Sequence, residues 1–179
     1  MIKKLSKQNW LDFALKELTR NGHAKLTANR LASELGVSRG SFYWHFNDVR
    51  EFDKALLKRW SELTTDDVIA QMQLIESPKL RLLTLVQRAM NAEMKLERAV
   101  RSWATSEKMV AKAVHTVDAQ RVAYIESNLQ AMGVAKQEIK VRAQMLYWSS
   151  VGRMMLSEPG GKVTLADSEL ERFVDLLVS

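Results

Sequence analysis

The segment Ser38–Phe46 gathers side chains that could contact a nucleic acid. It ends in four aromatic residues and a histidine within five positions, Phe42-Tyr43-Trp44-His45-Phe46. On a helix, Phe42 and Phe46 are one turn apart and face the core, whereas Gly40 and Trp44 point to the opposite side. A helix of about two turns cannot bury all of these rings. Part of the aromatic surface must therefore face outward, although isolated aromatic residues on a helix are usually core residues.

The outward residues carry the chemistry of DNA recognition. Arg39 can form a bidentate pair of hydrogen bonds with guanine. Gly40 lets DNA approach the backbone, and Ser41 can hydrogen-bond a base edge or a phosphate. Further phosphate contacts are expected from hydroxyl and ring donors at helix N-termini and on this helix. The residues that we predict for them are Thr27, Ser38, Tyr43, Trp44 and His45.

Three short helices are predicted to position these residues. Apolar spacing predicts a helix from Ser6 to Asn21, and Gly22 ends it. Thr27 can cap a second helix that Gly36 ends, and Ser38 can cap a third that runs through about His45. Two short helices joined by a glycine turn are typical of a helix-turn-helix, whose second helix enters the DNA major groove.

The distribution of charge agrees with this interpretation. The net charge is +6. Residues 1–60 hold 12 Lys or Arg against 6 Asp or Glu, whereas residues 61–179 hold 15 of each. The whole basic excess therefore lies beside the predicted helix-turn-helix, where it can attract phosphates, although a solvated basic face would show the same excess.

The run Leu31-Ala32-Ser33-Glu34-Leu35-Gly36-Val37-Ser38-Arg39-Gly40-Ser41-Phe42-Tyr43-Trp44-His45-Phe46 resembles the helix-turn-helix of bacterial TetR-type transcriptional regulators. The resemblance covers about residues 7–60. It implies a dimeric repressor that binds a palindromic DNA operator. It also implies that a ligand bound in the helical part after the helix-turn-helix moves the fourth helix and so releases the repressor from DNA. Members of the family often carry a phosphate-contacting Lys near the start of the fourth helix. Val49 stands there in this chain, and Arg50 or Lys54 could replace that contact.

The rest of the chain is expected to be helical. Long apolar patterns predict helices over about residues 48–77, 78–94, 106–132, 137–156 and 167–179, with a short one at 98–105. The fold class is all-α, with about nine helices: an N-terminal three-helix helix-turn-helix DNA-binding head on a helical ligand-binding and dimerisation body. We place the DNA-binding domain at residues 1–50 and the effector-binding and dimerisation domain at 51–179.

Two functional surfaces are predicted in this body. Soft and aromatic residues could line a pocket for a largely apolar or aromatic small-molecule effector. They are Met90, Met94, Trp103, Tyr124, Tyr147 and Trp148. The last two helices are predicted to form a homodimer interface through small residues and an apolar face. Its residues are Ser149, Gly152, Leu170, Phe173, Val174 and Leu177. In both cases the alternative is that these residues form the core of the monomer.

Other classes of protein find less support. The sequence has no phosphate-binding glycine loop, serine elbow or His-Glu-x-x-His motif, so we expect no enzyme and no cofactor. It has no Cys and 3 His, so we expect no metal site. No apolar run could span a membrane and no signal peptide is visible, so we expect a cytoplasmic protein. Two alternatives stay open: a DNA-binding protein of this fold that acts through a protein partner without an effector, and a non-specific nucleoid protein.

Overall fold

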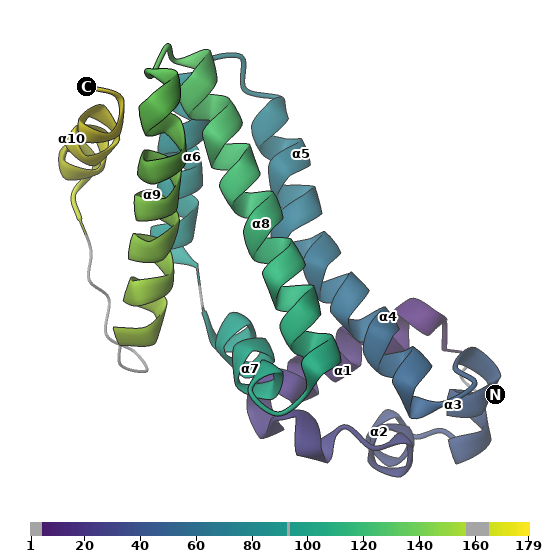
Figure 1. Cartoon of the computed structure of the whole chain (residues 1–179). Helices are drawn as coiled ribbons and strands as arrows, with labels where there is room; N and C mark the ends of the chain where they lie inside the picture. The colour runs from purple at the N-terminus through teal and green to yellow at the C-terminus, as the bar shows by residue number, and fades with distance from the viewer. Residues whose placement is uncertain (1–4, 93, 157–164) are drawn as a thin grey trace. The chain divides into compact units, whose positions relative to one another are not determined.

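The computed structural model describes residues 5–92, 94–156 and 165–179, and all regular elements in these residues are helical (Figure 1). This confirms the all-α fold class. The elements are α1 (Lys7–Asn21), η1 (His23–Lys25), α2 (Ala28–Leu35), α3 (Arg39–His45), α4 (Val49–Ser61), η2 (Glu62–Asp66), α5 (Asp67–Gln73), α6 (Pro78–Asn91), α7 (Lys95–Ala104), α8 (Lys108–Ala131), α9 (Lys136–Leu156) and α10 (Asp167–Val178). No helix in the described ranges is long and apolar enough to cross a membrane.

The first helices begin and end at the predicted capping residues. The side chain of Ser6 accepts a hydrogen bond from the amide of Asn9, and that of Thr27 accepts one from the amide of Arg30. Gly22 and Gly36 follow α1 and α2 with φ of 73° and 68°, values that favour glycine because it has no Cβ. The predicted bounds of these helices are therefore confirmed, and so is the physical reason for them.

The sequence predicts one continuous helix over about residues 48–77, but the structure interrupts it. α4 passes into the π-helical turn η2 and then into α5. The hydroxyl of Thr64 donates to the carbonyl of Trp60 (2.8 Å), a backbone contact that competes with regular helical bonding. A π turn holds an extra residue, which rotates the following side chains around the helix axis.

The chain forms two compact units. Unit 1 comprises Met1–Thr64 and Lys95–Val114, and unit 2 comprises Thr65–Met94 and His115–Ser179. Unit 1 therefore contains the predicted DNA-binding segment together with α7 and the start of α8. The predicted functional boundary between residues 50 and 51 differs from this division and stays a prediction.

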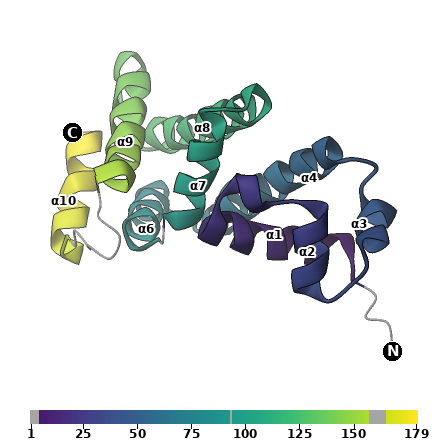
Figure 2. The same cartoon turned by 90° about the horizontal axis from the view of Figure 1, so that it is seen from below.

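Aromatic rings fill the core of unit 1. Phe42 lies 5.6 Å from Trp10, 5.0 Å from Phe46 and 5.2 Å from Phe52 between ring centroids. Trp60 is also fully buried. These rings come from α1, α3, the residue after α3, and α4, so a single cluster holds α3 in place. Figure 2 shows α3 following α2 and leading into the start of α4.

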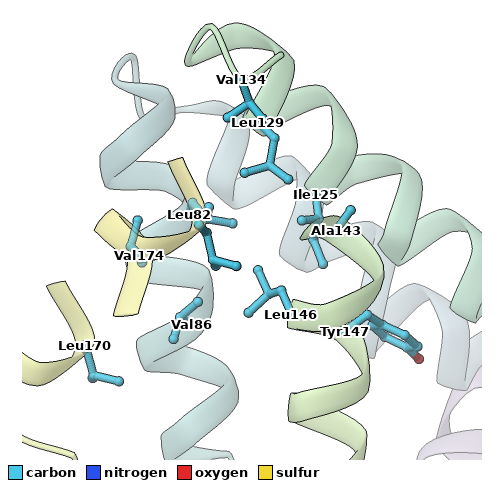
Figure 3. Packing of buried hydrophobic residues seen from close by; sticks show 11 residues of the cluster. Leu82, Val86, Ile125, Leu129, Val134, Ala143, Leu146, Tyr147, Leu170 and Val174 are labelled. Atoms are coloured by element: carbon cyan, nitrogen blue, oxygen red, sulfur yellow. The ribbon is translucent and has the colours of Figure 1, made fainter. Parts of the chain in front are cut away.

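Aliphatic side chains fill the core of unit 2. They converge from α6, α8, α9 and α10 (Figure 3). The cluster comprises Leu82, Val86, Ile125, Leu129, Val134, Ala143, Leu146, Tyr147, Leu170, Val174 and Leu177. α10 packs on α6, so the last helix contributes one complete face to the core of its own unit.

Candidate nucleic-acid interface

The turn between α2 and α3 has the geometry of a helix-turn-helix. After Gly36, the amide of Val37 donates to the carbonyl of Ala32 (3.0 Å). This bond and the left-handed conformation of Gly36 end α2 and direct the chain into α3. Ser38 has the extended backbone of a helix cap, but its side chain makes no capping hydrogen bond.

The two sides of α3 differ as predicted. The side chain of Phe42 is 0% exposed and that of Phe46 is 1% exposed. By contrast, Trp44 is 74% exposed and Tyr43 is 41% exposed. Burial in the aromatic core explains Phe42 and Phe46, but it does not explain two large rings that α3 holds in solvent.

Arg39 lies on the exposed side and contacts Tyr43. Its guanidinium group is 5.2 Å from the centroid of the Tyr43 ring, and Nη2 donates to the phenolic oxygen at 3.1 Å. One turn of helix separates the two residues. The ring therefore supports a planar group with several donors on the outer surface of α3.

Gly40 is not required by the packing of the protein. A Cβ placed there would lie 3.7 Å from the hydroxyl of Ser38, which is an ordinary contact. Glycine weakens a helix by about 1 kcal/mol relative to alanine, so alanine would suit the isolated protein better. This observation supports the prediction that Gly40 makes room for something outside the chain.

The predicted phosphate contacts surround this side. Thr27 is exposed and uses its oxygen as a helix cap, so its hydroxyl hydrogen can still be donated. Arg50 and Lys54 are exposed on the first turns of α4, whereas Ser41 is half-buried. Val49 is 43% exposed and offers no hydrogen-bond donor from its side chain.

His45 is engaged within the protein. Its Nε2 lies 2.8 Å from the carbonyl oxygen of Leu5, so Nε2–H donates to that carbonyl. The ring is half-buried. Because Nε2–H is bonded to Leu5, the other ring nitrogen of His45 could donate to a phosphate only in the protonated, doubly N–H form of the ring. The sequence has no local signal for a partner 40 residues away.

Glu51 is the charged centre of the α3–α4 corner. Its Oε2 accepts hydrogen bonds from the amide of Asn47 (2.9 Å) and from the Asn47 side chain (2.7 Å). Its Oε1 accepts one from Nζ of Lys7 (3.1 Å). The backbone hydrogen bond from Asn47 and then the bond from Lys7 hold the pKa of Glu51 below its usual 4.5.

The six residues predicted for an effector pocket do not form one group. Trp103 belongs to unit 1, where it is buried and stacks on His23 with 3.8 Å between ring centroids. In unit 2, Tyr147 is buried and donates to Asp118 (2.5 Å), whereas Trp148 is 65% exposed. The remaining three, Met90, Met94 and Tyr124, are half-buried. Trp103 is thus a packed residue of unit 1 and Trp148 a surface residue of unit 2. Sequence spacing did not distinguish these positions from the wall of a pocket.

A cavity of about 230 Å³ lies within unit 2. Its wall includes Met90, one of the predicted residues, and adds apolar side chains and one guanidinium group. The lining comprises Val86, Met90, Leu146, Ser149, Ser150, Arg153, Leu165, Leu170 and Phe173. Sequence reasoning missed Arg153 because a single arginine near a helix end has no distinguishing pattern.

The residues predicted for a dimer interface on α10 serve the core of unit 2. Leu170, Val174 and Leu177 are buried in the core of unit 2, and Phe173 packs against it, so these side chains are used by the monomer. This favours the alternative that the last helix covers its own core. On α9, Ser149 is exposed and Gly152 is half-buried. The exposed large apolar residues of α9 are Val141, Met145, Trp148 and Met155.

Comparison with known proteins agrees with this fold. Residues 11–52 match the family model described as bacterial regulatory proteins, tetR family. Over 54 residues the chain is 37% identical to the uncharacterized HTH-type transcriptional regulator TtgW of Pseudomonas putida. That alignment covers 30% of this chain and 40% of TtgW, so the chain matches less than half the length of this curated relative.

The likeness to solved structures extends over nearly the whole chain. A protein from Saccharomonospora viridis in complex with choline has a TM-score of 0.75 and 19% identity, covering 96% of this chain and 94% of that chain. The reduced form of E. coli NemR has a TM-score of 0.75 and 17% identity, with coverage of 96% and 95%. AibR, in complex with isovaleryl coenzyme A and operator DNA, has a TM-score of 0.68 and 15% identity, with coverage of 96% and 97%. At these identities the likeness shows the fold.

The fold and the α2–α3 geometry define an all-helical protein with an N-terminal helix-turn-helix. Residues 11–52, which hold this helix-turn-helix, are similar to the tetR family of bacterial regulatory proteins. The matched family is one of bacterial regulatory proteins, which agrees with the expectation of a regulator.

Proposed function

We propose that this protein is a sequence-specific DNA-binding transcriptional regulator that represses from a palindromic operator. The observation that carries the proposal is the division of α3 into a buried face of Phe42 and an exposed face of Arg39, Tyr43 and Trp44. Such a face fits the major groove, where side chains read base edges. Because the operator would be chromosomal, we expect the protein to act in the cytoplasm.

We assign roles by chemistry. Arg39 reads guanine with two hydrogen bonds, and Gly40 permits close approach. Thr27, Ser38, Ser41, Tyr43 and Trp44 donate to phosphates or base edges from α2 and α3. Arg50 and Lys54 supply cations from α4, in place of the lysine that many relatives carry where this chain has Val49.

We propose a homodimer, with α9 as its principal contact. Val141, Met145 and Trp148 are exposed at spacings of four and three, and Met155 follows two turns after Trp148. Residues at this spacing share one side of a helix, and such a side is unusual in a monomer. Leu176 adds an exposed apolar residue on α10. Sedimentation at micromolar concentration would test this, because a monomer would contradict it.

We further propose that a small, largely apolar or aromatic effector releases the operator. The cavity of unit 2 supports an effector because it combines apolar walls with Ser149, Ser150 and Arg153. Two solved structures of similar fold contain such partners: one is a complex with choline, and the other is a complex with isovaleryl coenzyme A and operator DNA. They support the proposal that this fold can bind a small molecule as well as DNA. The alternative is a regulator without an effector that acts through a protein partner.

The proposed function is tested by selecting bound sequences from a random duplex pool at near-physiological salt. We expect a palindrome whose half-sites lie about one helical turn of DNA or more apart. Recovery of no sequence motif would contradict specific regulation and would favour non-specific nucleoid binding.

A further inference from the structure

Three contacts fix the start of α1 against the corner where α3 ends and α4 begins. The carbonyl of Leu5 accepts a hydrogen bond from Nε2 of His45 (2.8 Å). Nζ of Lys7 lies 3.1 Å from Oε1 of Glu51 and 4.9 Å from the centroid of the Phe46 ring. Because Leu5 is itself buried, the backbone ahead of Lys7 is anchored from inside as well.

These contacts hold the ammonium group of Lys7 in a defined place that is still open to solvent. The side chain of Lys7 is 47% exposed. An ammonium group has three N–H donors and Glu51 accepts from one of them. The second oxygen of Glu51 is occupied by the two donors of Asn47. Lys7 can therefore donate to a further acceptor without leaving Glu51.

The charge of the corner shows why such a cation matters. The cap and first two turns of α4 contain three carboxylates, Asp48, Glu51 and Asp53, against the two cations Arg50 and Lys54. Asp53 faces His23, with 3.4 Å between Oδ1 and Nε2. Without Lys7, this end of α4 carries a negative formal balance when His23 is neutral, and it would repel a DNA phosphate.

We propose that Lys7 is a DNA phosphate contact, delivered to the α3–α4 corner from α1, and that His45 is a positioning residue that holds Lys7 there through the carbonyl of Leu5. This inference rests on the proposed DNA-binding function and adds α1 to a surface otherwise formed by α2, α3 and α4. It gives His45 a role different from the direct phosphate contact that its position in the sequence indicates.

A purely structural role makes a different prediction. An exposed Lys–Glu pair contributes little to stability, and its loss would leave DNA binding unchanged. A phosphate contact instead releases counterions, so its loss lowers the slope of log affinity against log salt by about 0.9. The slope therefore separates the two roles.

The experiment compares the full-length protein with Lys7→Gln, using the selected operator and a scrambled duplex across a range of salt concentrations. Lys16→Gln is the matched control, because Lys16 is an exposed lysine on the same helix. We expect Lys7→Gln to weaken binding to both duplexes alike. Its loss of affinity between roughly 50 and 200 mM salt should be about threefold smaller than that of the unmodified protein. Lys16→Gln should keep the original slope.

The role of His45 is tested with His45→Phe, alone and combined with Lys7→Gln, after thermal unfolding shows that each variant folds. If His45 positions Lys7, the double variant should bind as Lys7→Gln alone does, whereas two independent phosphate contacts would give additive losses. An unchanged salt slope in Lys7→Gln would overturn the inference while leaving the proposed function intact. Failure of the unmodified protein to prefer the operator would instead count against the proposed function.

Discussion

The helix-turn-helix of unit 1 and the long helices of unit 2 distribute apolar residues in different ways. In α3, inner and outer sides are sharply separated, as Phe42 and Trp44 show. α9 buries Ala143, Leu146 and Met154 but exposes Met145 and other large apolar residues on a different side. A short helix with one apolar side has one way to pack, whereas a long helix that is apolar on several sides can face both a core and a partner. This difference underlies the proposal that α3 contacts DNA and that α9 serves both folding and association.

The largest expected effect tests whether α10 belongs to the core of unit 2. Leu170→Ala should destabilise the protein by about 2–5 kcal/mol, because it leaves a cavity in a packed core. Glu171→Ala is the matched control, since Glu171 is exposed on the same helix and lies outside the proposed dimer contact, and it should change stability by less than about 0.5 kcal/mol. Chemical denaturation measures both. Equally small effects of the two substitutions would show that Leu170 does not contribute to the core of unit 2.

The next effect concerns the base-reading role of unit 1. Arg39→Ala should cost about 1–3 kcal/mol of binding to the selected operator and relax base preference at one position of each half-site. Lys54→Ala should weaken binding to all duplexes evenly and lower the salt slope. Binding to a panel of single-base variants distinguishes the two. If both variants lose affinity in the same way, the division of roles between α3 and α4 is wrong.

At Gly40 we expect a smaller effect, in which one substitution raises the stability of the protein but lowers its affinity for DNA. Gly40→Ala should stabilise the protein by up to about 1 kcal/mol, because alanine favours the helix and meets no close contact. The added methyl group should nevertheless weaken DNA binding. Thermal unfolding and operator titration on the same sample would show this divergence, and a variant that binds DNA normally would refute the close-approach role.

The smallest effect is the pH dependence of the α3–α4 corner. Since the folded protein holds the pKa of Glu51 below 4.5, ionised Glu51 stabilises the fold above the pKa of the unfolded state. That contribution is lost as pH falls through the folded pKa. The stability advantage over Glu51→Gln should therefore be present at about pH 7 and shrink below about pH 4. If the difference in stability between the unmodified protein and Glu51→Gln stays constant across this pH range, the ionisation of Glu51 does not contribute to that difference.

The sequence predicted unit 1 well because its signals are local. Caps such as Thr27 and the positive-φ glycines Gly22 and Gly36 act over a few residues, and the spacing of Phe42 and Phe46 determines the inner side of α3. The contact between His45 and Leu5 could not be predicted in this way, because it joins residues 40 positions apart.

In unit 2 the sequence identified helices but not the neighbour that each side meets. Leu170 and Trp148 are both apolar residues on predicted helices, yet one is 4% exposed and the other 65%. Helical periodicity describes one helix at a time. Which side packs on α6 and which faces solvent depends on the arrangement of helices far apart in the chain, and only the structure supplies it.

We propose that the exposed side of α3 serves DNA binding and not the stability of the protein. The most direct test is Trp44→Ala, measured by thermal unfolding and by binding to the selected operator. We expect a change in the free energy of unfolding below about 0.5 kcal/mol with at least about a tenfold loss of affinity, or roughly 1.4 kcal/mol. A destabilised protein that still binds the operator with its original affinity would show that Trp44 serves the fold and not DNA binding.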